Sequence, residues 1–369
     1  TKEFTTPEIK RSSLTATVLT MKKMGIKEIH NFDFIDKPEV EAWEAAISEL
    51  KLLGALDGKE ALTPIGELLA ELPLDPHLGR MIIEAEKYNC LSAVSTIAAF
   101  MEAAPIFVRP KDKEEEADAL HQRFKVEGSD FLTLLRVWDA YDRNHCSSEW
   151  AYSNFLNVRA LREVGQARQQ MFEVLNKKGI IITTGNETEL IQKAVVAGLI
   201  GTLMMRVGEK EYMRLRDRKA EIYIHPGSTS FYKPPQFIVS REVAKTTRAF
   251  ARGVQEVQCA WLPELAPHLF KEVEGALHYD PYNKRVEVRC GLIWRETNEK
   301  ITEYIRPAAP ESGAAYFAKV LAEGDVQLPF VEYNKGILRR LEELYRRSRG
   351  KVTLPVMAQW YGQRIGNAI

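Results

Sequence analysis

The stretch from residue 221 to residue 270 constrains the fold of this chain more than any other part. Ile222 and Ile224 alternate with polar neighbours, as in a half-buried strand, and the His-Pro-Gly-Ser sequence at 225–228 predicts a turn. Two prolines then precede a second strand at 237–239, further β-prone runs follow, and a capped helix is expected near the end of the stretch. Short strands that are joined by Gly/Pro turns and end on a helix are typical of a small closed barrel.

The composition is that of an ordinary globular protein, with 45% apolar and 28% charged residues, and 369 residues suffice for two to four domains. No apolar run approaches the roughly 18 residues of a membrane span, and no signal peptide opens the chain. The four cysteines lie far apart and form no Cys-x-x-Cys pair. This spacing disfavours a zinc site or a disulfide framework and favours a cytoplasmic location. Because the first residue is Thr, we expect a piece of a longer protein.

The first 75 residues predict two helices, a hairpin and a third helix, the order of a winged helix. Cap residues followed by proline start the first helix at Thr6 and the third at Thr63, and Asp57-Gly58 supplies the hairpin turn. The second helix is expected to start at Pro38. Its apolar stripe is expected to contain Val40, Trp43, Ile47 and Leu50.

The pattern is helical from His77 to about Lys178, and a single long helix is expected from Ser148. A further helix at 187–203 leads into the barrel. Beyond residue 270 we expect two short strands around a turn at 280–283. Helices are then expected at about 311–321, 331–348 and 354–365.

Four segments in this order resemble the C-terminal region of DEAH-box RNA helicases. They read LTPIGELLAELPLDP at 62–76, SDF at 129–131, HPGS at 225–228 followed by TTR at 246–248, and WLPELAPHLF at 261–270. The resemblance implies a multidomain α+β chain. Its parts would be a winged helix at 1–75, a helical ratchet bundle at 76–184, an OB-fold-like barrel at 185–270, and an additional α/β C-terminal extension at 271–369. The extension resembles, more loosely, the extra C-terminal region of some bacterial members.

The family also implies a function. The parent protein would be an ATP-dependent RNA helicase whose two RecA-like motor domains, which use ATP and magnesium, are not in this chain. The present part would bind single-stranded RNA, form one wall of the RNA channel, contact the RecA-like domains and, in some members, dock a glycine-rich activator protein. No membrane partner is expected.

Motor chemistry itself is not predicted for this chain. A phosphate-binding loop needs Gly-x-x-x-x-Gly-Lys followed by Ser or Thr, and the nearest sequence, at 54–60, is one residue short and ends in Glu60. No Asp-Glu-Ala-His sequence occurs. We therefore expect no catalytic residue, cofactor or metal site here, and no activity of the fragment alone.

The barrel region carries an uneven charge, with eleven Lys and Arg against five Asp and Glu between Arg206 and Arg252, although the whole chain is neutral. Single strands are held by cationic side chains along the backbone and by flat side chains under the bases, and turn hydroxyls suit phosphates. Intramolecular ion pairs with Glu163 or Glu173 are the competing interpretation for the arginines at 159–168, and turn capping is the competing one for His225. The residues expected to contact RNA are Arg159, Arg162, Arg168, Arg214, Arg216, His225, Ser228, Tyr232, Lys233, Arg241 and Lys245.

Two alternatives to the helicase interpretation stay open. One is a winged-helix nucleic-acid-binding regulator, but the helix from Pro38 carries four glutamates against two lysines between residues 37 and 51, which would repel a phosphate backbone. The other is a protein-binding scaffold, which the basic excess of the barrel disfavours.

Overall fold

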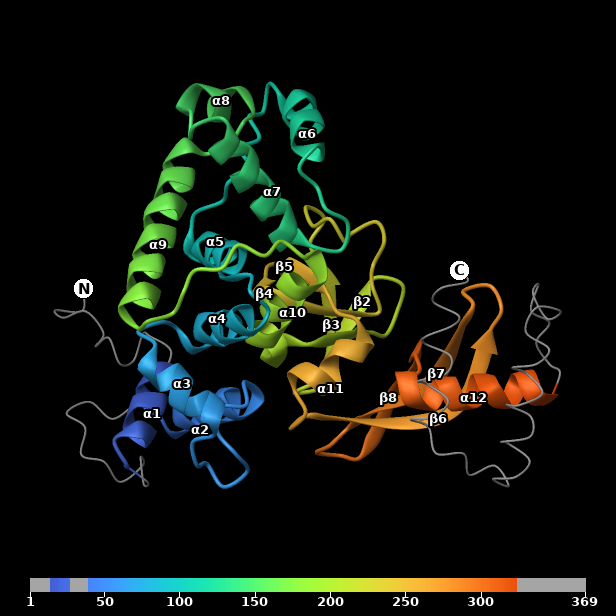
Figure 1. Ribbon diagram of the computed structural model, residues 1–369. Coiled ribbons are helices and arrows are strands. Elements are labelled where there is room, and N and C mark those ends of the chain that lie inside the picture. Colours follow the sequence, from blue (N-terminus) through green and yellow to red (C-terminus); the bar gives the residue numbers. More distant parts are fainter. Residues whose placement is uncertain (1–13, 27–38, 324–369) are drawn as a thin grey trace. The chain divides into compact units, whose positions relative to one another are not determined.

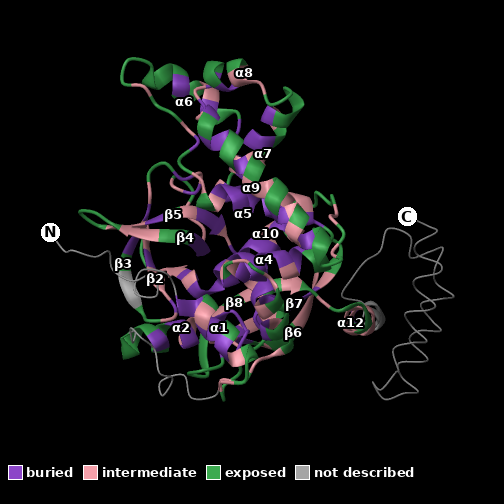
Figure 2. Ribbon diagram, turned by 90° about the vertical axis from the view of Figure 1, so that its left-hand side faces the viewer, coloured by how far each residue is buried: buried purple, intermediate pink, exposed green. Residues whose placement is uncertain are grey.

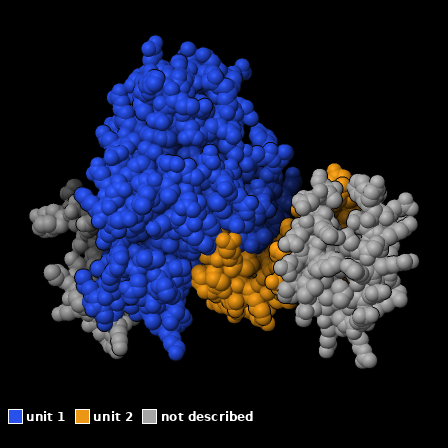
Figure 3. Space-filling model, viewed as in Figure 1, with its two compact units in different colours: residues 1–261 blue, residues 262–369 orange. Residues whose placement is uncertain are grey.

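The computed structural model describes residues 14–26 and 39–323. The chain divides into two compact units, residues 1–261 and 262–369, which are coloured separately in Figure 3. The helix starts predicted at Thr6 and Pro38, and the helices predicted at 331–348 and 354–365, lie outside the described residues.

Three short helices share an apolar core at the start of the first unit, with Trp43 and Leu50 buried in it. Thr63 caps the third helix, since its Oγ1 accepts a hydrogen bond from the Gly66 amide at 3.1 Å. Val40 is 55% exposed, so its assignment to the apolar stripe was wrong; it is the first residue of its helix. The helices are α1 (Leu14–Lys23), α2 (Val40–Leu52) and α3 (Pro64–Glu71).

A helical bundle follows, built on a core that includes Phe100, Trp138 and Leu161. Figure 1 shows α9 as the long green helix along the side of this bundle, and Figure 2 colours the chain by burial, with buried residues in purple. The helices are α4 (Pro76–Lys87), α5 (Leu91–Glu102), α6 (Glu114–Gln122), α7 (Asp130–Arg143), α8 (Ser148–Ser153) and α9 (Val158–Lys177).

The single long helix expected from Ser148 is two helices. Between α8 and α9, Phe155 adopts a left-handed backbone with φ of 51°, and Leu156 forms an isolated β-bridge with Phe107. Asn157 then starts α9, because its Oδ1 accepts a hydrogen bond from the Ala160 amide at 3.1 Å. The apolar spacing of the sequence does not reveal this break, because the break depends on the β-bridge to Phe107 and on the Asn157 cap.

The predicted closed barrel is confirmed. Its strands run in the spatial order β1-β2-β3-β5-β4, with β3 and β5 parallel and the other neighbours antiparallel. Helix α10 (Thr188–Leu199) packs between α4 and the barrel, and Tyr212, Ile222 and Val254 fill the interior. The strands are β1 (Met204–Arg206), β2 (Glu211–Arg214), β3 (Lys219–Ile224), β4 (Phe237–Lys245) and β5 (Ala249–Glu256).

The second unit is an antiparallel sheet of order β6-β7-β8 with one long helix packed on it, where the rings of Tyr279 and Phe317 meet at 5.2 Å. The two predicted strands around the 280–283 turn are present. Strand β8 was not predicted. The elements are α11 (Leu262–Leu265), β6 (Phe270–Asp280), β7 (Arg285–Trp294), β8 (Glu299–Pro307) and α12 (Pro310–Glu323).

Candidate nucleic-acid interface

The outer surface of the barrel carries aromatic and cationic side chains on the adjacent strands β3 and β5. Ile222 and Ile224 point into the barrel and are buried, so Tyr223 between them points outward. Phe250 lies opposite Tyr223 in the parallel ladder and has the same orientation. We call this surface the aromatic face; it consists of Tyr223, His225, Arg248, Phe250 and Arg252.

The side chains of the aromatic face contact one another. The guanidinium of Arg248 lies 5.1 Å from the centre of the Tyr223 ring, and the rings of His225 and Phe250 meet edge to face at 5.9 Å. Arg248 and Arg252 are exposed, whereas the three rings are half-buried. The face therefore offers flat rings that are already held in place beside two cations.

His225 has a defined protonation. The Gly227 amide donates a hydrogen bond to its Nδ1 at 3.1 Å, so the neutral ring carries its proton on Nε2. Burial, together with the charge of nearby Arg252, lowers the pKa of His225 below its ordinary value. The ring is therefore neutral at pH 7 and can donate a hydrogen bond outward from Nε2.

The positive charge of the face lies near the turn between β4 and β5. Lys245 is the register partner of Ala249 at the end of β4, and Arg248 follows within the same exposed turn. Further along the ladder, Glu242 lies opposite Arg252 and opposes its charge. His225 is thus the predicted RNA contact that the structure brings to this surface. Lys245 shares its side of the ladder with Ala249, which packs against the barrel core, and therefore lies on the side opposite to Phe250.

Ser228 has an internal partner that the sequence did not predict. Its Oγ donates a hydrogen bond at 3.0 Å to Asp130 of α7, and the amide and hydroxyl of Thr229 donate to the same carboxylate oxygen at 2.8 and 3.0 Å. The hydroxyls of Ser228 and Thr229 are therefore bound to a carboxylate within the protein. A contact between Ser228 and phosphate stays a prediction.

Arg216 is also committed to an internal partner. Its guanidinium pairs with Glu49 of α2, whose side chain is 16% exposed. The pair connects the first three-helix domain to the β2–β3 connection of the barrel. Arg216 was expected to present its head group to solvent, whereas in the structure the head group pairs with a half-buried carboxylate.

Arg168 lies inside the helical bundle. It donates hydrogen bonds to Thr96 Oγ1 at 2.8 Å and Ser92 Oγ at 3.0 Å, and it stacks 4.4 Å from the centre of the Phe172 ring. Burial lowers its pKa. Arg168 therefore joins α9 to α5, and we no longer expect it to contact RNA.

The other predicted contacts are dispersed. Arg214 pairs with Asp217, Lys233 with Glu127, and Arg159 with Glu163, each at or near the surface. Arg162 donates to Ser148 Oγ at 2.7 Å. Tyr232 is 83% exposed on the β3–β4 loop, and Arg241 is exposed on β4.

Four members of the aromatic face were missed by sequence reasoning, namely Tyr223, Arg248, Phe250 and Arg252. The alternation of the sequence could have identified Tyr223 as an outward residue, because it lies between two buried isoleucines. No local pattern predicts that β3 pairs with β5, because these strands become neighbours only when the barrel closes.

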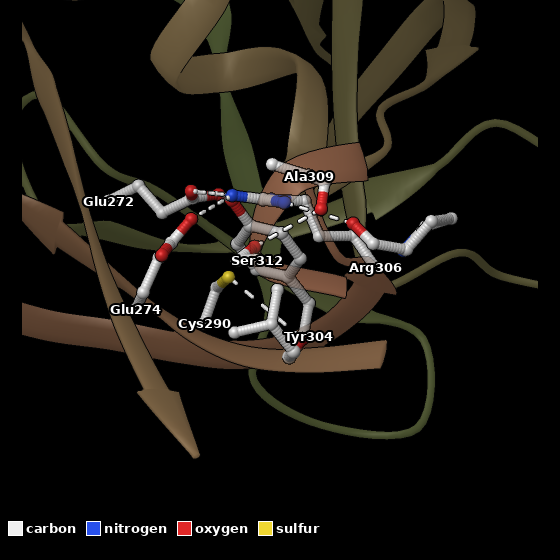
Figure 4. Close-up of polar contacts among 9 residues, drawn as sticks. Glu272, Glu274, Cys290, Tyr304, Arg306, Ala309 and Ser312 are labelled. Atoms are coloured by element: carbon white, nitrogen blue, oxygen red, sulfur yellow. Dashed lines mark hydrogen bonds and ion pairs between the residues drawn. The ribbon is translucent and has the colours of Figure 1, made fainter. Parts of the chain in front are cut away.

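The second unit contains a polar cluster that spans its three strands (Figure 4). Arg306 of β8 donates hydrogen bonds at 2.6 Å to Glu272 and to Glu274 of β6, and Tyr304 also donates to Glu272. Hydrogen bonding from Arg306 lowers the pKa of Glu272, and burial raises the pKa of Cys290, on the central strand, to about 11. These groups satisfy one another and hold the two edge strands in register.

Neither a metal-binding cluster nor a membrane-spanning helix is found among the described residues. Within residues 14–26 and 39–323, no group of three or more His, Cys, Asp or Glu side chains is arranged to hold a metal ion. None of the helices in these ranges combines the length and the apolar character that a membrane span requires.

Three domain models match the chain in the order of its structural parts. Residues 46–74 match the winged-helix part of the helicase associated domain (HA2), and residues 75–134 match its ratchet-like part. Residues 191–269 match the oligonucleotide/oligosaccharide-binding (OB)-fold. The last match covers β1 to β5 and thus the whole aromatic face.

A curated relative is similar to most of this chain. The pre-mRNA-splicing factor ATP-dependent RNA helicase prp22 of Schizosaccharomyces pombe is 32% identical over 266 residues, which make up 72% of this chain. The alignment covers 23% of prp22, so the chain spans less than a quarter of the length of that relative. Together with the three domain matches, this similarity shows that the chain belongs to the DEAH-box helicases and carries their C-terminal region of winged-helix, ratchet-like and OB-fold domains.

Proposed function

We propose that this chain is the non-motor part of an ATP-dependent RNA helicase and binds single-stranded RNA on the aromatic face of its barrel. In the whole protein this face forms part of one wall of the RNA channel. RecA-like domains outside the chain bind ATP and magnesium and supply the hydrolysis. A glycine-rich activator protein is a further proposed partner of the C-terminal modules.

The observation that carries this proposal is the pairing of Tyr223 with Phe250, flanked by Arg248. Stacking of a base on an aromatic side chain contributes about 1–3 kcal/mol and tolerates any base, because every base has a flat face. Contacts between cations and phosphates add affinity that falls with salt as counterions are released. Rings beside cations thus favour weak, salt-sensitive binding with little sequence preference.

A duplex-reading regulator fits these observations less well. Helix α2 exposes Glu41 and Glu44, and its Glu49 is paired with Arg216 of the barrel connection. A recognition helix needs cationic or amide side chains toward the major groove. The acidic surface of α2 would instead repel the phosphates on either side of that groove.

Fluorescence anisotropy with a labelled single-stranded RNA tests the proposal. Phe250→Ala removes a stacking surface, so we expect binding to weaken about tenfold, in the lower half of the range for one base. Arg248→Ala should reduce the slope of log affinity against log salt by about 0.7, the value for one contact on a single strand. Arg289→Ala, which removes an arginine that is 63% exposed on β7 and is not among the expected RNA contacts, is the matched control.

The outcomes separate the possible functions. Wild-type affinity in both barrel variants would show that the aromatic face does not bind RNA. Binding restricted to duplex DNA would support the regulator, and no binding to any nucleic acid would support the scaffold.

A further inference from the structure

Asp130 connects the ratchet-like bundle to the barrel at two places. Its Oδ1 accepts hydrogen bonds from Ser228 and Thr229 of the β3–β4 loop, as described above. Its Oδ2 accepts one from the Val254 amide of β5 at 2.8 Å. One carboxylate at the start of α7 therefore holds two separate segments of the barrel.

The residues next to Asp130 extend this contact. Ser129 Oγ donates to Gln255 Oε1 at 2.6 Å, and the Glu256 amide donates to the Gly128 carbonyl at 2.8 Å. Gly128 has a φ of 78°, and a Cβ at this position would collide with the Glu256 side chain. Residues 128–130 therefore contact residues 254–256 at the end of β5 through a series of hydrogen bonds.

The two segments held by Asp130 are those that carry the aromatic face. The β3–β4 loop begins at His225, three residues before Ser228, and Val254 follows Arg252 on β5 by two residues. The contact between the His225 and Phe250 rings joins the same two segments. Loss of the Asp130 carboxylate would remove the hydrogen bonds that hold the β3–β4 loop and β5 to α7, and these two segments carry the His225 and Phe250 rings.

We infer that Asp130 is a positioning residue for nucleic-acid binding, which holds the aromatic face in its binding geometry through the loop and through β5. This inference rests on the proposed function. It also predicts that a shift of α7 within the bundle reaches the aromatic face through this carboxylate, because Asp130 is the first residue of that helix.

If Asp130 acts by positioning, its loss should lower RNA affinity; if it acts only through its charge, its loss should raise RNA affinity. A carboxylate near a nucleic acid repels phosphates, so removal of its charge alone would tighten binding. Removal of a positioning group weakens binding. The direction of the change therefore distinguishes the two roles.

Asp130→Asn is the informative variant in the 369-residue chain. Its side chain keeps the shape but has one acceptor oxygen, and the NH2 group then faces either the Val254 amide or the Ser228 and Thr229 donors. No orientation satisfies both sides. We expect RNA affinity to fall at least about fivefold, the lower end of couplings between sites in a protein.

Two further readouts accompany the affinity. The slope against log salt should stay at the wild-type value, because no phosphate contact is removed. Hydrogen exchange at the Thr229 and Val254 amides should accelerate, since their acceptor is weakened.

Glu127→Gln is the matched control. Glu127 is an exposed carboxylate three residues from Asp130, and it pairs at 2.9 Å with Lys233, an exposed residue farther along the β3–β4 loop. An ion pair between two exposed side chains holds the loop more weakly than the hydrogen bonds that Asp130 accepts. Loss of the Glu127 carboxylate removes the same charge and releases a lysine, so affinity should be unchanged or higher. Weaker binding in Asp130→Asn with no loss in Glu127→Gln supports the inference.

The combined change Ser228→Ala and Thr229→Val tests the inference if Asp130→Asn does not fold. It removes two hydroxyl donors and leaves the Thr229 and Val254 amides bound to Asp130. We expect RNA affinity between those of the wild type and Asp130→Asn, and full wild-type affinity in this variant would overturn the inference.

The failures of the two proposals are distinguishable. Wild-type or tighter binding in Asp130→Asn, with weakened binding in Phe250→Ala, overturns the positioning role and leaves the proposed function intact. Wild-type binding in Phe250→Ala and Arg248→Ala overturns the proposed function, and the positioning role with it.

Discussion

Arg216→Ala should destabilise the chain by removing the partner of Glu49. The Glu49 carboxylate is 16% exposed, the Arg216 side chain is 29% exposed, and the other cation near Glu49 is His77, with its Nε2 at 3.8 Å from Oε1. Breaking a fully buried pair costs about 3–5 kcal/mol, and an exposed pair contributes about 0–1 kcal/mol. Because one partner is largely buried and the other is partly screened, we expect a loss of about 1–2 kcal/mol.

Calorimetry and hydrogen exchange measure this loss. A change of this size lowers the melting temperature of a unit of roughly 250 residues by about 2–4 °C. Exchange should accelerate in α2, which carries Glu49. Arg159→Ala, at an exposed pair on α9, should leave the melting temperature unchanged.

A double-mutant cycle with Glu49→Gln isolates the pair. If the two side chains act together, the double variant is destabilised by less than the sum of the single variants. Wild-type stability in Arg216→Ala, combined with weaker RNA binding, would refute the reasoning and return Arg216 to the RNA-binding surface.

Three further predictions address the bundle, its pH dependence and the motor. Burial lowers the pKa of His121, whose Nε2 lies 3.1 Å from the Phe155 carbonyl, so the unfolded chain takes up a proton first as pH falls. Stability should be complete above about pH 6.5 and fall below it, and His121→Gln should flatten melting curves measured from pH 5 to 7. Arg168→Lys should cost about 1–3 kcal/mol in urea unfolding, since lysine cannot reproduce the bonds to Ser92 and Thr96 and the stacking on Phe172; RNA affinity at the wild-type value is expected alongside. The purified chain should release no phosphate from ATP, with or without RNA, and turnover that follows the protein through purification would contradict this.

Local signals in the sequence predicted much of the fold. The Thr63-Pro64 helix start is confirmed by its cap, and the 225–228 turn lies where His-Pro-Gly-Ser predicts it. Alternation identified the inward residues Ile222 and Ile224. These features depend on residues that are close in sequence, which is why propensity and spacing suffice for them.

The sequence did not predict contacts that depend on distant residues. The Ser228 hydroxyl donates a hydrogen bond to Asp130, which is 98 residues away in the chain. Arg216 meets a carboxylate 167 residues away. Strand β8 was missed because its register against β7, rather than its own charged and mixed sequence, makes it a strand.

Photo-crosslinking with a single-stranded RNA that contains 4-thiouridine tests the central claim most directly. Base stacking on the aromatic face would bring the thiocarbonyl next to Tyr223, His225 and Phe250, so mass spectrometry should locate crosslinks at 223–225 and 248–252. The crosslinks should disappear in Phe250→Ala and fall in Asp130→Asn. Crosslinks concentrated on α9 at 159–170, with none on β3 or β5, would contradict the account.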